Sequence, residues 1–207
     1  MGDDRRDDLR RHEGDDQAER DRERPDSGVG ADTVAVVVAV VVTHARSLPD
    51  VDGVVFVEIP AGSRNKYEWD AELGAIALDR RLFTSMSYPA DYGFIEGTLG
   101  EDGDPLDALV LVGEPTFPGC RIRARAVGVF HMADEKGPDE KVVCVPLNDP
   151  LWSGISDIHD VPPQLRNEIE HFFQVYKDLE DKKTETRGFG NRAEAQQIIA
   201  AARARAA

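Results

Sequence analysis

Three carboxylates fall within six residues at the start of the segment DGDPLDALVL, residues 102–111. Asp102, Asp104 and Asp107 lead into an apolar, β-prone run, so they belong to a turn that feeds a buried strand. Carboxylates about 4 Å apart repel by roughly 4 kcal/mol at an effective dielectric constant near 20, so close packing requires a cation, a proton or solvent between them. The pattern leaves two interpretations open, a solvated turn and a site for a hard cation.

The same segment is a poor match to a calcium-binding loop, in which acidic ligands surround a central glycine and a glutamate closes the site. Leu106 stands at a ligand position, Asp107 replaces the glycine and Gly113 replaces the glutamate. The metal hypothesis that remains is a hard cation shared with an anionic substrate.

A second acidic segment, ADEKGPDEK at residues 133–141, is a polar turn when it is taken alone. Together with residues 102–107 it provides two acidic loops, and Lys66, Arg80, Lys141 and Lys177 provide cations. Carboxylates suit Mg²⁺, which keeps several waters and bridges to phosphate oxygens, while Lys and Arg neutralise the remaining phosphate charge. Mixed charge of this kind favours a site for metal and phosphate.

Length and composition predict one soluble domain, because the chain has 207 residues, of which 41% are hydrophobic and 31% charged. The formal net charge of −15 argues against nucleic acid as a partner, since phosphate backbones bind basic patches. Cys120 and Cys144 lie in strand-like segments, which indicates buried free thiols in a reducing compartment. The histidines lack a zinc-binding spacing such as HExxH, which argues against a zinc enzyme.

Residues 1–50 are expected to form a disordered tail with a short valine-rich segment, and residues 51–207 the folded domain. The first 32 residues hold 12 acidic residues and 7 arginines, a net charge of −5 (7 minus 12), with little apolar surface. The apolar run of nine within residues 33–43 is shorter than the roughly 20 residues of a membrane helix, and the region before it is too acidic for a secretory signal. We therefore expect a cytoplasmic protein without a membrane partner.

Short strands separated by Gly and Pro predict a small curled sheet or barrel; they cover residues 54–59, 66–70, 75–79, 109–112, 122–131 and 142–145. Strands and helices do not alternate, so a parallel sheet is disfavoured. Apolar residues from Leu165 to Leu179 recur at helical spacing and predict an amphipathic helix. A break is expected at residues 188–190, followed by a second helix over 192–206 with Asn191 as its cap. The predicted class is α+β.

Five motifs in a fixed order carry a family resemblance: EIPAGSRNKYEWD from Glu58, LDRRLFTSMSYPADYGFI from Leu78, DGDPLDALVL, ADEKGPDEK, and FFQVYKDLE from Phe172. Residues 54–190 thereby resemble the soluble family I inorganic pyrophosphatases of bacterial type. The resemblance implies a five-stranded OB-like β-barrel flanked by two C-terminal helices. It also implies hydrolysis of inorganic diphosphate to two orthophosphates by Mg²⁺-activated water, several Mg²⁺ ions per site with Mn²⁺ as a substitute, and a homo-oligomer, in the family a homohexamer.

The motif positions also imply a role for each candidate residue. The implied metal ligands are Asp102, Asp107, Asp134, Asp139 and Glu58; the implied general base is Asp104; the implied substrate-binding residues are Lys66, Arg80, Tyr92, Lys141, Tyr176 and Lys177; and Glu68 lines the site. Simpler interpretations stay open for some of them. Lys66 and Glu68 would also suit a surface pair, Arg80 a surface charge, Tyr92 a barrel plug and Tyr176 the core.

Two other functions compete with diphosphate hydrolysis. The first is a non-enzymatic binding module, because small barrels commonly bind oligonucleotides or sugars, although the net charge of −15 counts against it. The second is a broader phosphohydrolase that acts on nucleotides or other phosphate esters, since composition does not show how tightly the pocket closes. The family resemblance favours the small symmetric substrate.

Overall fold

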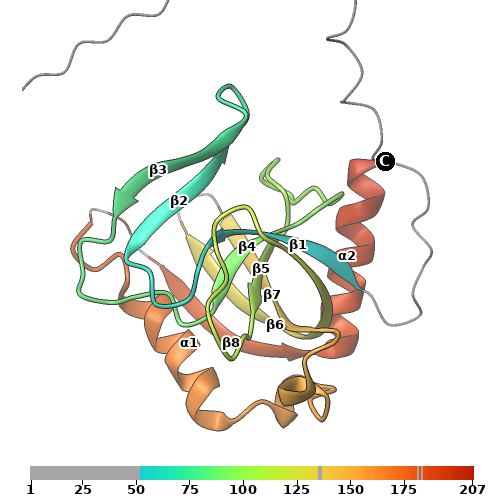
Figure 1. Ribbon diagram of the computed structural model, residues 1–207. Helices are drawn as coiled ribbons and strands as arrows, with labels where there is room; N and C mark the ends of the chain where they lie inside the picture. The colour runs from blue at the N-terminus through green and yellow to red at the C-terminus, as the bar shows by residue number, and fades with distance from the viewer. Residues whose placement is uncertain (1–51, 135–136, 181, 183) are drawn as a thin grey trace, which may run out of the picture. The chain divides into compact units, whose positions relative to one another are not determined.

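The computed structural model describes residues 52–134, 137–180, 182 and 184–207 of the chain (Figure 1). The predictions for the tail at residues 1–50, including its valine-rich segment, lie outside the described residues.

Five strands form a closed ring: β1 (Gly53–Ile59), β4 (Asp91–Ile95), β5 (Asp107–Val110), β7 (Gly137–Pro146) and β6 (Arg121–Asp134). The ring closes because β1 pairs with both β4 and β6. This confirms the predicted α+β class with five OB-like strands and two helices. The sheet is mainly antiparallel, in line with the expectation against a parallel sheet, and one pair, β5 and β7, runs parallel with Ala108 opposite Val142. The intervening strand β6 supplies the crossover, so no helix is needed between them.

A separate two-stranded sheet consists of β2 (Asn65–Asp70) and β3 (Ala75–Arg81), and it extends away from the ring (Figure 1). Both strands were predicted, although as part of the single curled sheet. Their antiparallel register places Lys66 opposite Arg80. The hairpin therefore brings two of the candidate phosphate ligands together by local pairing alone.

Strand β4 was not among the strands predicted from alternation, because its sequence contains Asp91 and Gly93. The glycine is required by the close approach of β1, since a Cβ added to Gly93 would lie 1.9 Å from the backbone oxygen of Phe56. Asp91 is fully buried and accepts hydrogen bonds from the backbone N–H of Ala61 at 2.8 Å and from Thr116 Oγ1 at 2.6 Å. A buried carboxylate with such partners is compatible with a strand.

The expected break at residues 188–190 is wrong, because these residues belong to β8 (Glu185–Asn191), which pairs antiparallel with β6. Phe189 lies opposite Phe130, and the two rings are 5.0 Å apart between centroids. Gly188 adopts a φ of 80°, which L side chains rarely adopt. Pairing along β6 and this aromatic contact outweigh the tendency of the two glycines to interrupt a strand.

The helices α1 (Pro163–Val175) and α2 (Arg192–Ala206) were both predicted, but α1 ends earlier than its apolar stripe suggested. Leu179 was assigned to that stripe and is instead 68% exposed beyond the end of the helix. Asn191 caps α2 as predicted, since its side chain accepts from the backbone N–H of Glu194 at 3.0 Å. Two short 3₁₀ helices, η1 (Pro150–Trp152) and η2 (Ile158–Asp160), connect β7 to α1.

Alternate residues of the ring strands pack into two apolar clusters, one with each helix. Leu109 and Val143 pack in the cluster that contains Phe172 and Phe173 of α1. Their neighbours Val110 and Cys144 belong to the cluster that contains Ala195 and Ile199 of α2. Both cysteines are free thiols as predicted, and Cys144 is buried, but Cys120 is only partly buried. Within the described part of the chain, no helix has the length and apolar character needed to cross a membrane.

Candidate active site

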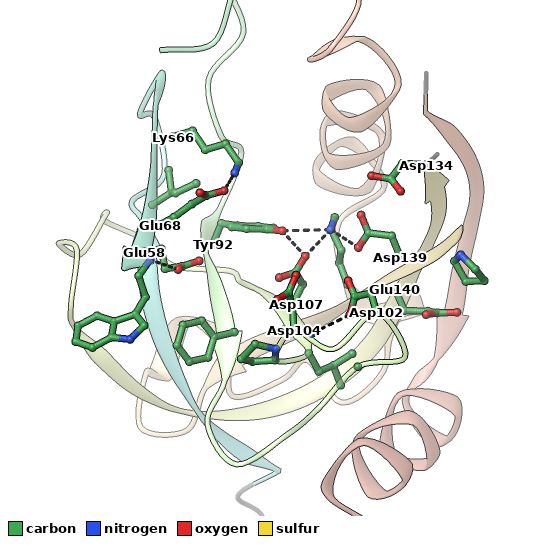
Figure 2. Close-up of a pocket in the computed structure, with 18 of the residues that line it drawn as sticks. Glu58, Lys66, Glu68, Tyr92, Asp102, Asp104, Asp107, Asp134, Asp139 and Glu140 are labelled. Atoms are coloured by element: carbon green, nitrogen blue, oxygen red, sulfur yellow. Dashed lines mark hydrogen bonds and ion pairs between the residues drawn. The ribbon is translucent and has the colours of Figure 1, made fainter. Parts of the chain in front are cut away.

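All of the predicted site residues line one pocket of roughly 790 Å³, and Figure 2 labels most of them. They come from strands of the ring, from the β2–β3 hairpin, from the loop between β4 and β5 and from the segment that follows α1; they are Glu58, Lys66, Glu68, Arg80, Tyr92, Asp102, Asp104, Asp107, Asp134, Asp139, Lys141, Tyr176 and Lys177. Residues far apart in the sequence thus face one volume, which is larger than diphosphate alone requires and leaves room for ions and water.

Strand register explains why Asp107, Asp139 and Lys141 meet. Ala108 lies opposite Val142 in the parallel β5–β7 pair, so Asp107 and Lys141 are neighbours at the same end of the two strands. Asp139 precedes Lys141 by two residues on β7 and so points to the same face. The proximity of these three side chains follows from pairing between distant segments rather than from local sequence.

Lys141 is the centre of this group, which we call the Lys141 cluster: Lys141, Asp107, Asp139 and Tyr92. Its Nζ lies 2.7 Å from Asp107 Oδ2 and 2.7 Å from Asp139 Oδ1, and it donates to the Tyr92 hydroxyl at 3.2 Å (Figure 2). The Tyr92 hydroxyl in turn donates to Asp107 Oδ2. The Lys141 side chain is only 2% exposed, so these polar partners are what make its burial tolerable.

The pKa shifts in the cluster have opposing causes. Burial alone would lower the pKa of Lys141, but the carboxylates of Asp107 and Asp139 outweigh burial and raise it. Burial raises the pKa of Asp139, against the lowering effect of Lys141. Burial, followed by the negative charge of Asp107, raises the pKa of Tyr92. At neutral pH Lys141 is therefore a cation and Tyr92 a neutral hydrogen-bond donor.

Glu58 approaches the pocket from the end of β1 and is fixed by the hairpin, because its Oε1 accepts from the backbone N–H of Trp69 at 2.7 Å. Burial raises the pKa of Glu58 to about 7.

The Lys66 ammonium pairs with Glu68, and it lies 3.4 Å from Asp79 Oδ2. The predicted Lys66–Glu68 pair is therefore real, and it lies in the pocket lining rather than apart from it (Figure 2).

Arg80 is held by carboxylates rather than left free at the surface. Its Nη2 lies 2.9 Å from Glu180 Oε2 and its Nε 3.2 Å from Glu180 Oε1, a two-pronged contact, while Nη1 pairs with Asp79. The Glu180 side chain is 7% exposed. The guanidinium plane is consequently fixed before any anion binds.

The segment after α1 contributes Tyr176 and Lys177. Tyr176 is 6% exposed and stacks on Phe172 with 5.1 Å between ring centroids, yet it also lines the pocket, so the core and pocket interpretations both apply. Lys177 Nζ lies 3.5 Å from Asp134 Oδ2. This ion pair places Asp134 beside a second cation of the pocket.

The other acidic side chains lie on a loop, residues 99–105, which we call the acidic loop. Asp102 and Asp104 are exposed, and Gly103 between them adopts a φ of 93°. The Asp104 backbone N–H donates to Asp102 Oδ1 at 3.2 Å, and that of Gly100 donates to the Asp104 carbonyl at 2.6 Å. Most carboxylate lone pairs of the loop remain open to solvent or to a cation.

The donor set fits Mg²⁺. Every candidate ligand is a carboxylate, and hard divalent cations prefer oxygen. Among the described residues, no three acidic, His or Cys side chains converge as a preformed cage. Mg²⁺ does not require one, because it usually binds through one or two carboxylates together with substrate phosphates and retained waters.

Three further residues of the site were missed from the sequence: Asp79 and Arg205, which line the pocket, and Glu180, which holds Arg80 from outside the pocket lining. Asp79 joins Lys66 to Arg80, and the adjacent motif LDRR was the signal for it. Glu180 lies 100 residues from Arg80 in sequence, so no local pattern links them. Arg205 lines the pocket from the end of α2, far in sequence from the motifs that name the other site residues.

A sequence profile described as inorganic pyrophosphatase matches residues 55–207. The chain belongs to the inorganic pyrophosphatase family. It is 65% identical to the inorganic pyrophosphatase of Streptomyces coelicolor over 130 residues, 63% of this chain and 80% of that protein. It is 57% identical to that of Leifsonia xyli over 148 residues, 71% and 91% of the two chains. The crystal structure of the Thermus thermophilus inorganic pyrophosphatase is similar with a TM-score of 0.73 and 47% identity, covering 74% of this chain and 90% of that chain.

Proposed function

We propose that this chain hydrolyses inorganic diphosphate to two orthophosphates with Mg²⁺, and that Mn²⁺ can substitute. The observation that carries the proposal is the pocket, which unites carboxylates for hard cations with Lys, Arg and Tyr side chains for phosphate oxygens. Relatives at 50–65% identity are named inorganic pyrophosphatases, which supports the same reaction for this chain.

The metal-binding side of the pocket consists of Asp102, Asp107, Asp134, Asp139 and Glu58. Bound Mg²⁺ lowers the pKa of coordinated water and neutralises phosphate charge. Asp107 would bind a cation through its carboxylate, whose Oδ2 accepts hydrogen bonds from Lys141 and Tyr92. Glu58 binds a cation as its carboxylate, and a nearby cation offsets the burial that raises its pKa.

The phosphate-binding side consists of Lys66, Arg80, Lys177, Tyr92, Tyr176 and Lys141. Arg80 and Lys66 lie opposite each other on the hairpin and present two positive charges to one end of the pocket. Glu180 and Asp79 fix the Arg80 guanidinium, so little side-chain entropy remains to be lost when phosphate binds. Such positioning and electrostatics supply nearly all catalysis in phosphoryl transfer.

We assign the role of general base to Asp104. Among the described residues, its exposed carboxylate on the acidic loop makes no hydrogen bond or ion pair with another side chain, while its backbone is fixed by Asp102 and Gly100. It is therefore available to accept the proton of the attacking water. Glu68 contributes indirectly because it holds the Lys66 ammonium.

A phosphate-release assay on the full chain tests the proposal, with diphosphate, ATP and a phosphate monoester as substrates, in the presence of Mg²⁺ or of a chelator. We expect rapid release from diphosphate with Mg²⁺, weak release from the other two substrates, and none with chelator. Equal turnover of the three substrates would favour the broader phosphohydrolase, and no release would leave the binding module.

We also propose a cytoplasmic homo-oligomer, a homohexamer as the sequence resemblance implies, that binds neither nucleic acid nor membrane. Light scattering coupled to gel filtration measures the subunit number, and a monomer at micromolar concentration would contradict the proposed oligomer.

The folded domain is proposed to be residues 51–207. Removing residues 1–50 should change the free energy of unfolding by less than about 0.5 kcal/mol and leave turnover intact, because the site residues begin at Glu58.

A further inference from the structure

The end of α2 holds the acidic loop through a single residue, Leu99. The Leu99 backbone N–H donates to the Ala202 carbonyl at 3.0 Å, and Arg205 Nε donates to the Leu99 carbonyl at 2.9 Å. Both backbone polar groups of Leu99 are thus bound by the last turn of the helix.

The other attachment of the loop is at its neck, where Thr98 is 6% exposed. Its Oγ1 donates to the Ile95 carbonyl at 2.6 Å and accepts from the Leu106 backbone N–H at 3.0 Å. These contacts close the base of the loop on β4 but do not reach its tip. The orientation of Asp102 and Asp104 therefore depends on the α2 contact at Leu99 as well as on the neck.

Arg205 also brings positive charge to a strongly acidic segment. Its Nη1 lies 4.0 Å from Glu101 Oε1, and the side chain lines the pocket together with Asp102 and Asp104. Glu101 is 79% exposed, so this ion pair contributes little to stability. The hydrogen bond to the Leu99 carbonyl is the directional contact, and the charge reduces repulsion among the three neighbouring acids.

We propose that Arg205 is a positioning residue, which holds the acidic loop through the Leu99 backbone so that Asp102 and Asp104 face the pocket in an arrangement suited to Mg²⁺. The inference rests on the proposed function and adds to it a residue at the far end of the chain. Arg205 itself contacts neither substrate nor metal in this role. Its loss should weaken metal binding at Asp102 and lower turnover through Asp104.

Titration calorimetry of the substrate-free full chain with Mg²⁺ tests this directly. Arg205→Met keeps most of the apolar stem but removes the donor, and we expect Mg²⁺ affinity to fall about three- to tenfold, as for the loss of one hydrogen bond of average strength. Arg205→Lys keeps the charge, and its Mg²⁺ affinity should lie between those of the parent and of Arg205→Met. Turnover at saturating Mg²⁺ should also fall, because Asp104, the proposed general base, lies on the same loop and loses the same support.

Arg203→Met is the matched control, because Arg203 lies on the same helix turn but donates to the Asp52 carbonyl at the start of the domain. It should lower thermal stability without changing Mg²⁺ affinity. Parent-like Mg²⁺ affinity in both Arg205 variants, or equal weakening in Arg203→Met, would overturn the proposal. Failure of the parent chain to hydrolyse diphosphate would contradict the proposed function, whereas the calorimetric comparison would still decide the role of Arg205.

Discussion

The Lys141 cluster and the acidic loop present carboxylates to the same pocket in different ways. Asp107 and Asp139 lie on paired strands and share a buried ammonium at 2.7 Å. Asp102 and Asp104 lie on an exposed loop whose described contacts are mainly through the backbone. A cation that reaches the loop displaces only water, whereas a cation that reaches the cluster must compete with Lys141.

This difference indicates how the pocket tolerates its negative charge before it binds metal. Inside the ring, an internal cation and the Tyr92 hydroxyl balance the carboxylates, since unpaired buried charges are costly. On the loop, solvent balances them. The two regions should therefore respond differently to the same kind of substitution.

The largest effect is expected for Asp107→Asn, which keeps the shape of the side chain but removes the charge shared by Lys141 and a metal ion. Turnover of diphosphate should fall by at least about 10³-fold, comparable to the loss of a key electrostatic group in other active sites. Asp178→Asn is the control, because Asp178 is exposed and does not line the pocket. Turnover of Asp107→Asn within a few-fold of that control would remove Asp107 from the reaction.

Lys141→Met should destabilise the metal-free protein, in addition to weakening phosphate binding. The substitution leaves Asp107 and Asp139 facing each other without their cation, which should cost about 3 kcal/mol of unfolding free energy. Mg²⁺ should recover part of this loss by replacing the missing charge. Denaturant unfolding with and without Mg²⁺ measures both quantities, and an unchanged metal-free stability would show that the buried pair contributes nothing net.

Asp102→Asn tests the exposed side of the comparison. Because the side chain is solvated, stability should change by less than about 0.5 kcal/mol. Apparent Mg²⁺ affinity should nevertheless fall about 10- to 100-fold, the range seen when a metal site is perturbed. Diphosphate hydrolysis measured against Mg²⁺ concentration reports the shift, and an unchanged Mg²⁺ profile would leave Asp102 as a residue of the turn only.

The smallest effect is a pH dependence from Glu58. A carboxyl group with a raised pKa makes the folded state bind more protons than the unfolded chain, so stability is highest below its usual pKa of 4.5 and falls as the pH rises to about 7. Glu58→Gln should remove this pH-dependent loss of stability from the metal-free protein. Melting temperatures of both proteins between pH 4 and 8 give the difference, which should shrink when Mg²⁺ is added; parallel curves would contradict the shift.

The fold could be predicted where local patterns decide it. The stripe of α1 and the cap Asn191 of α2 are local features, and both were confirmed. Strand β4 was missed because Asp91 is satisfied by Ala61 and Thr116, which lie 30 and 25 residues away in sequence. Strand β8 was missed because its glycines suggest a break, while the edge of β6 determines its conformation.

The site residues were predicted because the motifs name them, not because the sequence shows that they meet. Asp107 and Lys141 come together through the parallel β5–β7 register, which no periodicity indicates. Glu180 and Arg205 were not predicted, since each acts on a partner about 100 residues away. Motif order conveys which side chains share a pocket, and long-range pairing determines what holds them there.

The most direct test of the account is a crystal structure of the full chain with Mn²⁺ and a non-hydrolysable diphosphonate. The account predicts anomalous peaks in contact with the carboxylates of Asp102 and Asp107, and Lys141 Nζ moved from Asp107 towards a phosphonate oxygen. Peaks that avoid both carboxylates, with Lys141 still bridging Asp107 and Asp139, would contradict it.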